Sequence, residues 1–268
     1  MNRLLIVVAL ATAPAAMLAQ GPAFALSRFG EAGQQPPQPP ASARAGAPVD
    51  LTGQWVSVIS EDWRWRMVTP IKGDFASLPL NVAGIKAGQA WDPARDEAAG
   101  LQCKAYGAAA LMRLPVRVRI SWQDDNTLKL ETDEGMQTRL FRFGPGKPAE
   151  PSWQGYSVAN WERPPQGAAV QNPIPVFAGR TGGRGRALEV TTTRLRAGYL
   201  RKNGAPYSDQ AVLTEFFDHR RHSNAEEWFT VTAIVRDPVY LDGPFVTSSD
   251  FRKETDPSGW RPAPCAAR

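Results

Sequence analysis

Residues 116–143 read VRVRISWQDDNTLKLETDEGMQTRLFRF, and this stretch decides the fold class. Apolar residues alternate with charged or polar ones in three short segments of it, and a period of two is typical of a half-buried β-strand. Polar residues at 124–127 and the pair Glu134-Gly135 separate the segments and are typical of tight turns. The stretch therefore predicts three antiparallel strands joined by hairpins.

The same alternation continues along the chain in both directions. Candidate strands lie at 54–59, 63–67, 116–122, 128–132, 137–143, 152–161, 188–195, 211–218, 227–235 and 245–252. Short strands at regular spacing with turns between neighbours are typical of an antiparallel barrel or sandwich. We expect a mostly β protein, folded as an antiparallel lipocalin-like barrel of about eight to ten strands.

Two stretches break the strand pattern. In the excursion 70–114 we expect one or two short helices, and residues 92–100 are the clearest of them. Asp92 is a suitable N-cap, Pro93 fits the first helical position and Gly100 fits the end. The second stretch, 164–186, is rich in proline and glycine and predicts a long loop, for which a disordered insertion is favoured over a functional lid.

The N-terminus has the features of a signal peptide. Arg3 precedes an apolar run at 4–10, and Ala23-Phe24-Ala25 fits signal peptidase cleavage before Leu26. A membrane anchor is the alternative, but the run is shorter than the ~20 apolar residues of a spanning helix. Residues 31–48 hold five prolines and few large apolar side chains. We expect a signal peptide at 1–25, a flexible tether at 26–48 and one barrel domain at 49–268 in a periplasmic or secreted protein, with no membrane span in the mature chain.

Charge and cysteine content limit the partners and the compartment. Loss of Arg3 lowers the formal charge from +5 to +4, with 30 basic against 26 acidic residues, and the two signs are interspersed. A nucleic-acid partner is therefore not expected. Cys103 and Cys265 both remain after cleavage, and two thiols in an oxidising compartment favour a disulfide. A catalytic Cys103 is the alternative, but no histidine lies near it in the sequence.

Several motifs resemble known families. Gly53-Gln54-Trp55 at the first strand resembles the Gly-x-Trp signature of lipocalins and other calycin barrels. Longer motifs are similar to an uncharacterised family of exported bacterial proteins. They are EDWRWRMVTP (61–70), DEAAGLQCKAYG (96–107), WQDDNTLKLETDEGMQTRLF (122–141), GYLRKNGAPYS (198–208) and PAPC (262–265). The calycin resemblance implies a ligand-binding barrel, whereas the second resemblance carries no activity and no residue roles.

Familiar catalytic signatures are missing from the sequence. His219 and His222 lie in a polar run and have no third strong metal ligand nearby, so a solvated hairpin is favoured over a metal site. The glycine-rich run 179–185 lacks the lysine spacing of a phosphate-binding loop. We therefore expect neither a metal nor a cofactor.

Charged and aromatic side chains remain as candidates for chemistry. Alternation over 63–67 places Asp62, Arg64 and Arg66 on one strand face, which lies either in solvent, as a charge ladder, or inside the barrel. Inside a barrel, such groups would have shifted pKa values. The candidate acid–base residues are Asp62, Glu131, Glu215 and Tyr106. The candidate ligand-binding residues are Arg64, Arg66, Arg139, Trp65, Trp153, Trp161 and Tyr199.

Three functions are compatible with these features. The favoured one is an exported barrel that binds a small hydrophobic or aromatic molecule in its interior. The second is a cofactor-independent acid–base enzyme, a lyase, isomerase, hydratase or hydrolase, that uses the candidate residues in the same cavity. The third is an interaction domain of the cell envelope with an exposed apolar patch. The sequence assigns neither the ligand nor the oligomeric state.

Overall fold

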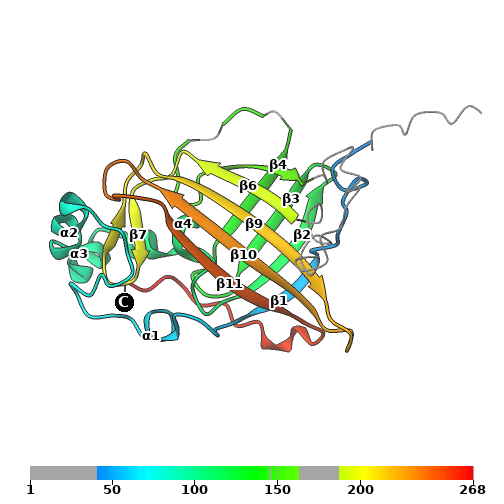
Figure 1. Ribbon diagram of the computed structural model, residues 1–268, viewed down its shortest axis with the longest axis horizontal. Coiled ribbons are helices and arrows are strands. Elements are labelled where there is room, and N and C mark those ends of the chain that lie inside the picture. The colour runs from blue at the N-terminus through cyan, green and yellow to red at the C-terminus, as the bar shows by residue number, and fades with distance from the viewer. Residues whose placement is uncertain (1–40, 145, 149, 163–186, 268) are drawn as a thin grey trace, which may run out of the picture. The chain divides into compact units, whose positions relative to one another are not determined.

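A computed structural model of the chain describes residues 41–144, 146–148, 150–162 and 187–267 (Figure 1). The predicted signal peptide, most of the predicted tether and the loop 164–186 lie outside the described residues. Among the helices that are described, none is long and apolar enough to cross a membrane.

Nine of the described strands close into a barrel in the order β1-β11-β10-β9-β6-β5-β4-β3-β2. Their bounds are β1 Gly53–Val58, β2 Arg117–Asp124, β3 Thr127–Thr132, β4 Thr138–Phe143, β5 Tyr156–Trp161, β6 Ala187–Thr193, β9 Val212–Arg221, β10 Glu227–Arg236 and β11 Phe245–Glu254. This confirms the predicted mostly β barrel. The expectation of an entirely antiparallel sheet is wrong at one place, because β4 and β5 pair in parallel.

The barrel interior is filled by large side chains of its own strands. Alternation along each strand directs Trp55, Phe141, Phe217, Phe229 and Phe251 inward, and each has an accessible surface of 0%. A side chain with no accessible surface borders no cavity that a water molecule could enter. These aromatic side chains are therefore packing groups that hold the barrel closed.

An ion pair is buried within the same interior. Arg139 on β4 donates from Nη1 to the Oε1 atom of Glu215 on β9 at 2.9 Å, and both side chains are 0% exposed. Its Nη2 atom also donates to the Thr192 hydroxyl at 3.2 Å. Arg139 shares its strand face with Phe141, which explains why alternation carries this charge into the core. Glu215 is therefore neutralised by a bidentate arginine.

The helices that precede β2 and a separate hairpin gather at one end of the barrel, where Figure 1 shows α2, α3 and β7 together, whereas η3 (Pro257–Gly259) follows β11 in the C-terminal tail. Their bounds are α1 Trp63–Arg66, α2 Val82–Gln89, α3 Pro93–Ala98, η1 Gln102–Tyr106, α4 Ala108–Leu111, β7 Gly198–Arg201 and β8 Ala205–Tyr207. All residues of α4 are buried. Ala108 and Ala109 join an apolar cluster with the ends of β9, β10 and β11, whereas Leu111 packs with Ala105 and Tyr106.

The excursion 70–114 holds more helix than the sequence predicts. The predicted helix after Asp92 is confirmed, and the Asp92 carboxylate accepts from the backbone N–H groups of Ala94 and Arg95 at 3.0 and 3.3 Å. The expectation of one or two helices is too low, because α2, η1 and α4 also lie in this region. Gly84 and Gly88 let α2 pack closely on Tyr240 and Phe75, where an added Cβ would come within 2.5 Å of a neighbouring atom.

The segment 63–67 is a short helix, so its prediction as a strand is wrong. Asp62 adopts a left-handed conformation with φ of 53°, which an aspartate tolerates better than most residues. Its carbonyl oxygen then accepts from the N–H groups of Trp65 and Arg66 at 2.8 and 3.1 Å. The predicted faces do not exist in this geometry, since Arg66 is buried and Trp63 is 63% exposed.

The last residues of the predicted tether pack on the barrel. The backbone N–H of Arg44 donates to the carbonyl oxygen of Asp125 at 3.0 Å. The indole N–H of Trp161 donates to the carbonyl oxygen of Ala43 at 2.9 Å. The folded part therefore begins a few residues before the expected boundary at 49.

Candidate functional site: a pocket lined by buried arginines

A pocket of about 250 Å³ lies at the helical end of the barrel, between α1, α4 and β7. Its walls are the segments 65–70, 110–115 and 200–202, together with Glu134 from the β3–β4 turn. The lining carries four cationic side chains against the single carboxylate of Glu134. The four cations are Arg66, Arg113, Arg201 and Lys202. This excess of positive charge favours an anion.

The turn at Asp62 places Arg66 inside the protein. The Nε–H of Arg66 donates to the carbonyl oxygen of Arg113 at 2.9 Å, and its Nη1 atom forms an ion pair with Glu61. Its Nη2 atom is buried and has no partner in the described part of the chain. Burial and the charge of Arg113 lower the pKa of Arg66, while Glu61 opposes them. The NH2 group at Nη2 of this cation therefore has no acceptor among the described residues.

Arg113 follows α4 and lies opposite Arg66. Its Nη2 atom donates to the Asp62 carboxylate at 3.1 Å, and its guanidinium carbon lies 5.4 Å from the centre of the Phe245 ring. Its Nη1 atom is buried without a partner among the described residues. Asp62 thus has two roles, because its backbone starts α1 and its side chain binds the second arginine.

Among the described residues, Arg201 at the end of β7 is the one lining arginine without an ion pair. Its Nη1 atom donates to the carbonyl oxygen of Ala76 at 2.7 Å, and its guanidinium carbon lies 5.2 Å from the centre of the Trp65 ring. Its Nε and Nη2 atoms are both buried without a partner in the described ranges. The indole nitrogen of Trp65 is also buried without a partner in those ranges. Burial, and then the charge of Arg113, lower the pKa of Arg201 to about 10.

The arginine nitrogen atoms without an acceptor among the described residues lower the stability of the protein unless something binds them. A buried N–H without an acceptor costs about 1–3 kcal/mol, and more when the group is charged. Arg66, Arg113 and Arg201 are 7%, 6% and 5% exposed, so little of each side chain is in contact with bulk solvent. An anion in the adjoining pocket would satisfy them, because oxyanions accept strong hydrogen bonds from guanidinium groups.

Lys202 and Glu134 form a second wall of the pocket, in which the charged groups are paired. The Nζ atom of Lys202 lies 2.8 Å from Glu134 Oε1 and 2.6 Å from the hydroxyl oxygen of Tyr106, which in turn donates to Glu134 at 3.1 Å. Burial alone would lower the pKa of Lys202, but the bonds to Glu134 and Tyr106 outweigh it and raise this pKa. All three groups are mutually satisfied, so this wall is preorganised.

A disulfide holds the C-terminal tail beside that wall. Cys103 and Cys265 are bonded across a sequence separation of 162 residues, as the sequence predicts. The N–H of Ala266 then lies 3.3 Å from the Tyr106 hydroxyl oxygen, and Ala263 forms a β-bridge with Glu134. The tail therefore supports the Tyr106–Glu134–Lys202 group from outside.

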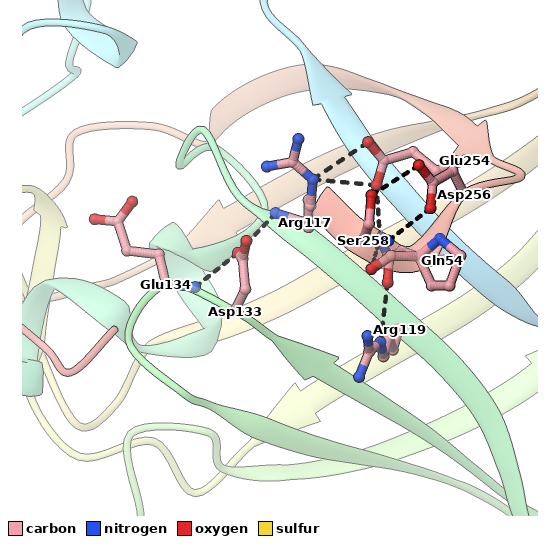
Figure 2. Close-up of polar contacts among 9 residues, drawn as sticks. Gln54, Arg117, Arg119, Asp133, Glu134, Glu254, Asp256 and Ser258 are labelled. Carbon is pink, nitrogen blue, oxygen red and sulfur yellow. Dashed lines mark hydrogen bonds and ion pairs between the residues drawn. The ribbon is translucent and has the colours of Figure 1, made fainter. Parts of the chain in front are cut away.

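Another charged cluster, on β1, β2 and β11, joins the start of the tail to the barrel (Figure 2). Glu254 accepts from Gln54 at 2.8 Å and from Nε of Arg117 at 3.1 Å. The Gln54 oxygen accepts from Nε of Arg119 at 3.0 Å, and Trp260 lies under the Arg119 guanidinium at 4.1 Å. Because these groups bind one another, we assign the cluster a structural role in anchoring the tail.

The part of the chain that the structure describes contains no group of three or more His, Cys, Asp and Glu side chains arranged for a metal ion. His219 lies on β9 with its ring against Trp55, and Nε2 is 3.5 Å from Glu227. His222 lies in the following turn, and its ring contacts Trp228.

The structure separates the predicted acid–base residues. Asp62 lies beside the pocket, bound to Arg113, and Tyr106 lies behind its wall. Glu131 is on the barrel surface with Lys129 at 3.0 Å. Glu215 is in the barrel interior with Arg139. The four predicted residues therefore do not meet in one site.

The predicted ligand-binding residues are divided in the same way. Trp65 and Arg66 line the pocket, whereas the Arg64 side chain is 73% exposed beside it. Trp153 packs under Arg196, and Trp161 stacks on Phe143.

Tyr199 also lies apart from the pocket. Its hydroxyl donates to Asp96 at 2.7 Å, and burial and this bond raise the pKa of Tyr199.

Four charged residues of the lining were not among the sequence candidates. Arg113, Glu134, Arg201 and Lys202 are contributed by three different segments. Arg113 and Arg201 each follow an apolar stretch, where a charged residue that the fold buries is a signal for a functional site. Local alternation cannot detect them, because neither residue lies in an alternating run.

Comparisons with protein-family models, with curated proteins and with solved structures give no match for this chain. The resemblances to calycins and to a family of exported bacterial proteins therefore stay predictions.

Proposed function

We propose that this chain is an exported β-barrel protein that binds a small organic anion in the arginine pocket at the helical end of the barrel. The observation that carries the proposal is a set of N–H groups on three buried arginines beside one pocket that have no acceptor among the described residues. The disulfide and the predicted signal peptide support export into an oxidising compartment.

We keep the apolar part of the predicted ligand, but we propose that it binds in the arginine pocket and not in the barrel interior. The sequence favours a hydrophobic or aromatic molecule in the barrel interior, but inward aromatic side chains such as Phe217 and Phe229 have no accessible surface. The arginine pocket offers free volume and apolar side chains, including Leu114 and Leu200. We therefore propose a ligand that has an apolar body and carries a negative charge.

Binding would change the environment of the arginines. Their free nitrogen atoms are covered by neighbouring side chains, so ligand entry requires small rotations of the guanidinium groups. An anion would replace missing acceptors with charge-assisted hydrogen bonds, each stronger than a neutral one. The rigid barrel and the disulfide-held tail would keep the rest of the wall in place.

Acid–base catalysis in the same pocket is the second candidate function. The close contacts among Tyr106, Lys202 and Glu134 favour it, because such a group can hold and move a proton. Tyr106 itself is 0% exposed, so of these three residues only Glu134 and Lys202 line the pocket. This arrangement is better suited to fixing the positive charge of Lys202 than to a proton transfer from Tyr106 to a ligand.

Native mass spectrometry of residues 26–268, purified from the bacterial periplasm without refolding, tests the proposal. Wild-type protein should carry a small acidic adduct that denaturation releases. Arg201→Gln should carry less of it than Arg221→Gln, which removes the same charge from the far end of β9. An adduct that changes mass during incubation would favour the enzyme. Equal occupancy in both variants would contradict the arginine pocket.

A further inference from the structure

We infer that the ligand is a small monocarboxylate with an apolar body, and that Arg201 is the residue that binds its carboxylate. This inference rests on the proposed function, since it names the chemistry of the anion in the same pocket. Three features of the pocket support it. They are the number of unpaired lining charges, the geometry of the Arg201 guanidinium group and the apolar residues of the lining.

The charge count favours a ligand with one negative charge. Three of the four lining cations have a carboxylate partner. The pairs are Arg66–Glu61, Arg113–Asp62 and Lys202–Glu134. Arg201 has no carboxylate within ion-pairing distance in the described part of the chain, although Asp62 and Asp74 favour its charged form from further away. One positive charge is therefore left without an ion-pair partner, and a monoanion neutralises it.

The free atoms of Arg201 match two oxygens in a plane. Nε and Nη2 of a guanidinium group present parallel N–H bonds along one edge. In Arg201 neither atom has a partner in the described ranges, while Nη1 is bound to Ala76. A carboxylate accepts both N–H groups side by side. A phosphate can do the same, so the geometry alone requires only an oxyanion.

The rest of the lining separates a carboxylate from inorganic phosphate. Ala110, Leu114, Pro115 and Leu200 contribute apolar surface to the pocket. Inorganic phosphate has no apolar part to bury there, and its second charge would exceed the one that is unpaired. A volume of about 250 Å³ lies just below the range of about 300–1,000 Å³ of pockets for drug-sized ligands. A carboxylate on a single ring or a short aliphatic chain therefore fits best.

Isothermal titration calorimetry with defined probes tests the inference. The carboxylates are benzoate, phenylacetate and hexanoate, and the comparison compounds are benzamide, sodium phosphate and sodium sulfate at equal ionic strength. At least one carboxylate should bind wild-type protein at least tenfold more tightly than benzamide, phosphate and sulfate. Benzamide keeps the ring and loses the charge, so it isolates the contribution of the carboxylate.

Two substitutions at one position separate bidentate binding from charge. Arg201→Gln should weaken carboxylate binding at least 30-fold, which is the range for losing hydrogen bonds to a charged group. Arg201→Lys keeps the charge but loses the paired N–H groups, and it should weaken binding about tenfold. Arg221→Gln lies at the far end of β9 and should bind as wild-type protein does. Circular dichroism and thermal unfolding identify any variant that fails to fold.

The outcomes distinguish this inference from the proposed function. If phosphate or sulfate binds as tightly as the best carboxylate, and Arg201→Gln abolishes that binding, the pocket stands and the monocarboxylate assignment is wrong. If a carboxylate binds equally to wild-type protein and Arg201→Gln, the role of Arg201 is wrong. If none of the six probes binds wild-type protein at millimolar concentration, the inference is contradicted, while the mass-spectrometric test still decides the proposed function.

Discussion

The Nε–H group of Arg66 donates to the main-chain oxygen of Arg113 at 2.9 Å, which joins α1 to the end of α4. Each of these arginines also has an ion-pair partner, so part of each guanidinium group holds the pocket walls together. Arg201 has a single hydrogen bond to Ala76 in the described residues and no ion pair. The three arginines should therefore respond differently to substitution.

Replacement of Arg201 by methionine should abolish binding without destabilising the ligand-free protein. The substitution removes a buried charge that lacks an ion-pair partner, and this gain offsets the lost hydrogen bond to Ala76. We expect the free energy of unfolding to stay within about 1 kcal/mol of wild type or to increase, as for residues kept for function at a cost in stability. Urea denaturation without ligand measures this difference.

Arg66→Met is the matched comparison for that experiment. It breaks the bond to Arg113 and the ion pair with Glu61, so it should lower the free energy of unfolding by about 1–3 kcal/mol. If Arg201→Met destabilises the protein as much as Arg66→Met does, Arg201 is a structural residue and the account of the pocket is wrong.

The buried ion pair in the barrel interior gives an independent prediction. Arg139→Met should lower the free energy of unfolding by about 3–5 kcal/mol, because it leaves the Glu215 carboxylate buried and uncompensated. The double variant Arg139→Met/Glu215→Leu should recover most of this loss, since an apolar pair can replace a buried ion pair. A double-mutant cycle by urea denaturation measures the coupling. Additive losses would show that the two side chains do not act as a pair.

Removal of the disulfide should destabilise the fold. Cys103→Ser/Cys265→Ser opens a loop of 162 residues, and the chain-entropy relation gives a loss of about 5 kcal/mol. Release of the tail also removes the contact between Ala266 and Tyr106. Urea denaturation of the variant, compared with wild type with and without reductant, measures the loss. Equal stability of variant and oxidised wild type would contradict the role given to the tail.

The affinity for benzoate should fall at high pH. An anion favours the charged form of Arg201, whose pKa burial and then Arg113 lower to about 10, while Asp62 and Asp74 oppose them. Protonated Arg201 is therefore retained at neutral pH and is lost as the pH rises through about 10. Lys202 has a raised pKa, so it loses its charge at a higher pH than an unperturbed lysine does.

Calorimetry between pH 7 and 11, with circular dichroism to verify folding, measures this dependence. We expect constant affinity up to pH 9 and a decrease above it. A decrease that begins below pH 8, or none up to pH 11, would contradict the assignment to Arg201. Arg201→Lys provides the comparison, because its weaker binding should follow the pKa of a different side chain.

The barrel could be predicted from the sequence because apolar and polar residues alternate along its strands. This local pattern arises because one face of each strand is buried in the core. The helix α3 could be predicted from Asp92 and Pro93, which act locally as cap and first residue. The error at 63–67 has a local cause as well. The Trp-Arg repeat there has the period of a strand, but the left-handed turn at Asp62 starts a helix.

Pairing between distant segments could not be predicted in the same way. The parallel pairing of β4 and β5 depends on the path of the intervening chain, which alternation does not encode. Arg113 and Arg201 meet only because α4 and β7 pack at the same end of the barrel. Of the pocket residues, the sequence identified Trp65 and Arg66 as candidates, and it gave them the wrong local structure.

A crystal structure of the wild-type protein with 4-bromobenzoate would locate the ligand, because bromine gives an anomalous signal. We expect a bromine peak in the pocket between α1, α4 and β7, with the carboxylate bound to the Nε and Nη2 atoms of Arg201. A peak in the barrel interior or on the outer surface, or an empty pocket at saturating ligand, would contradict this expectation.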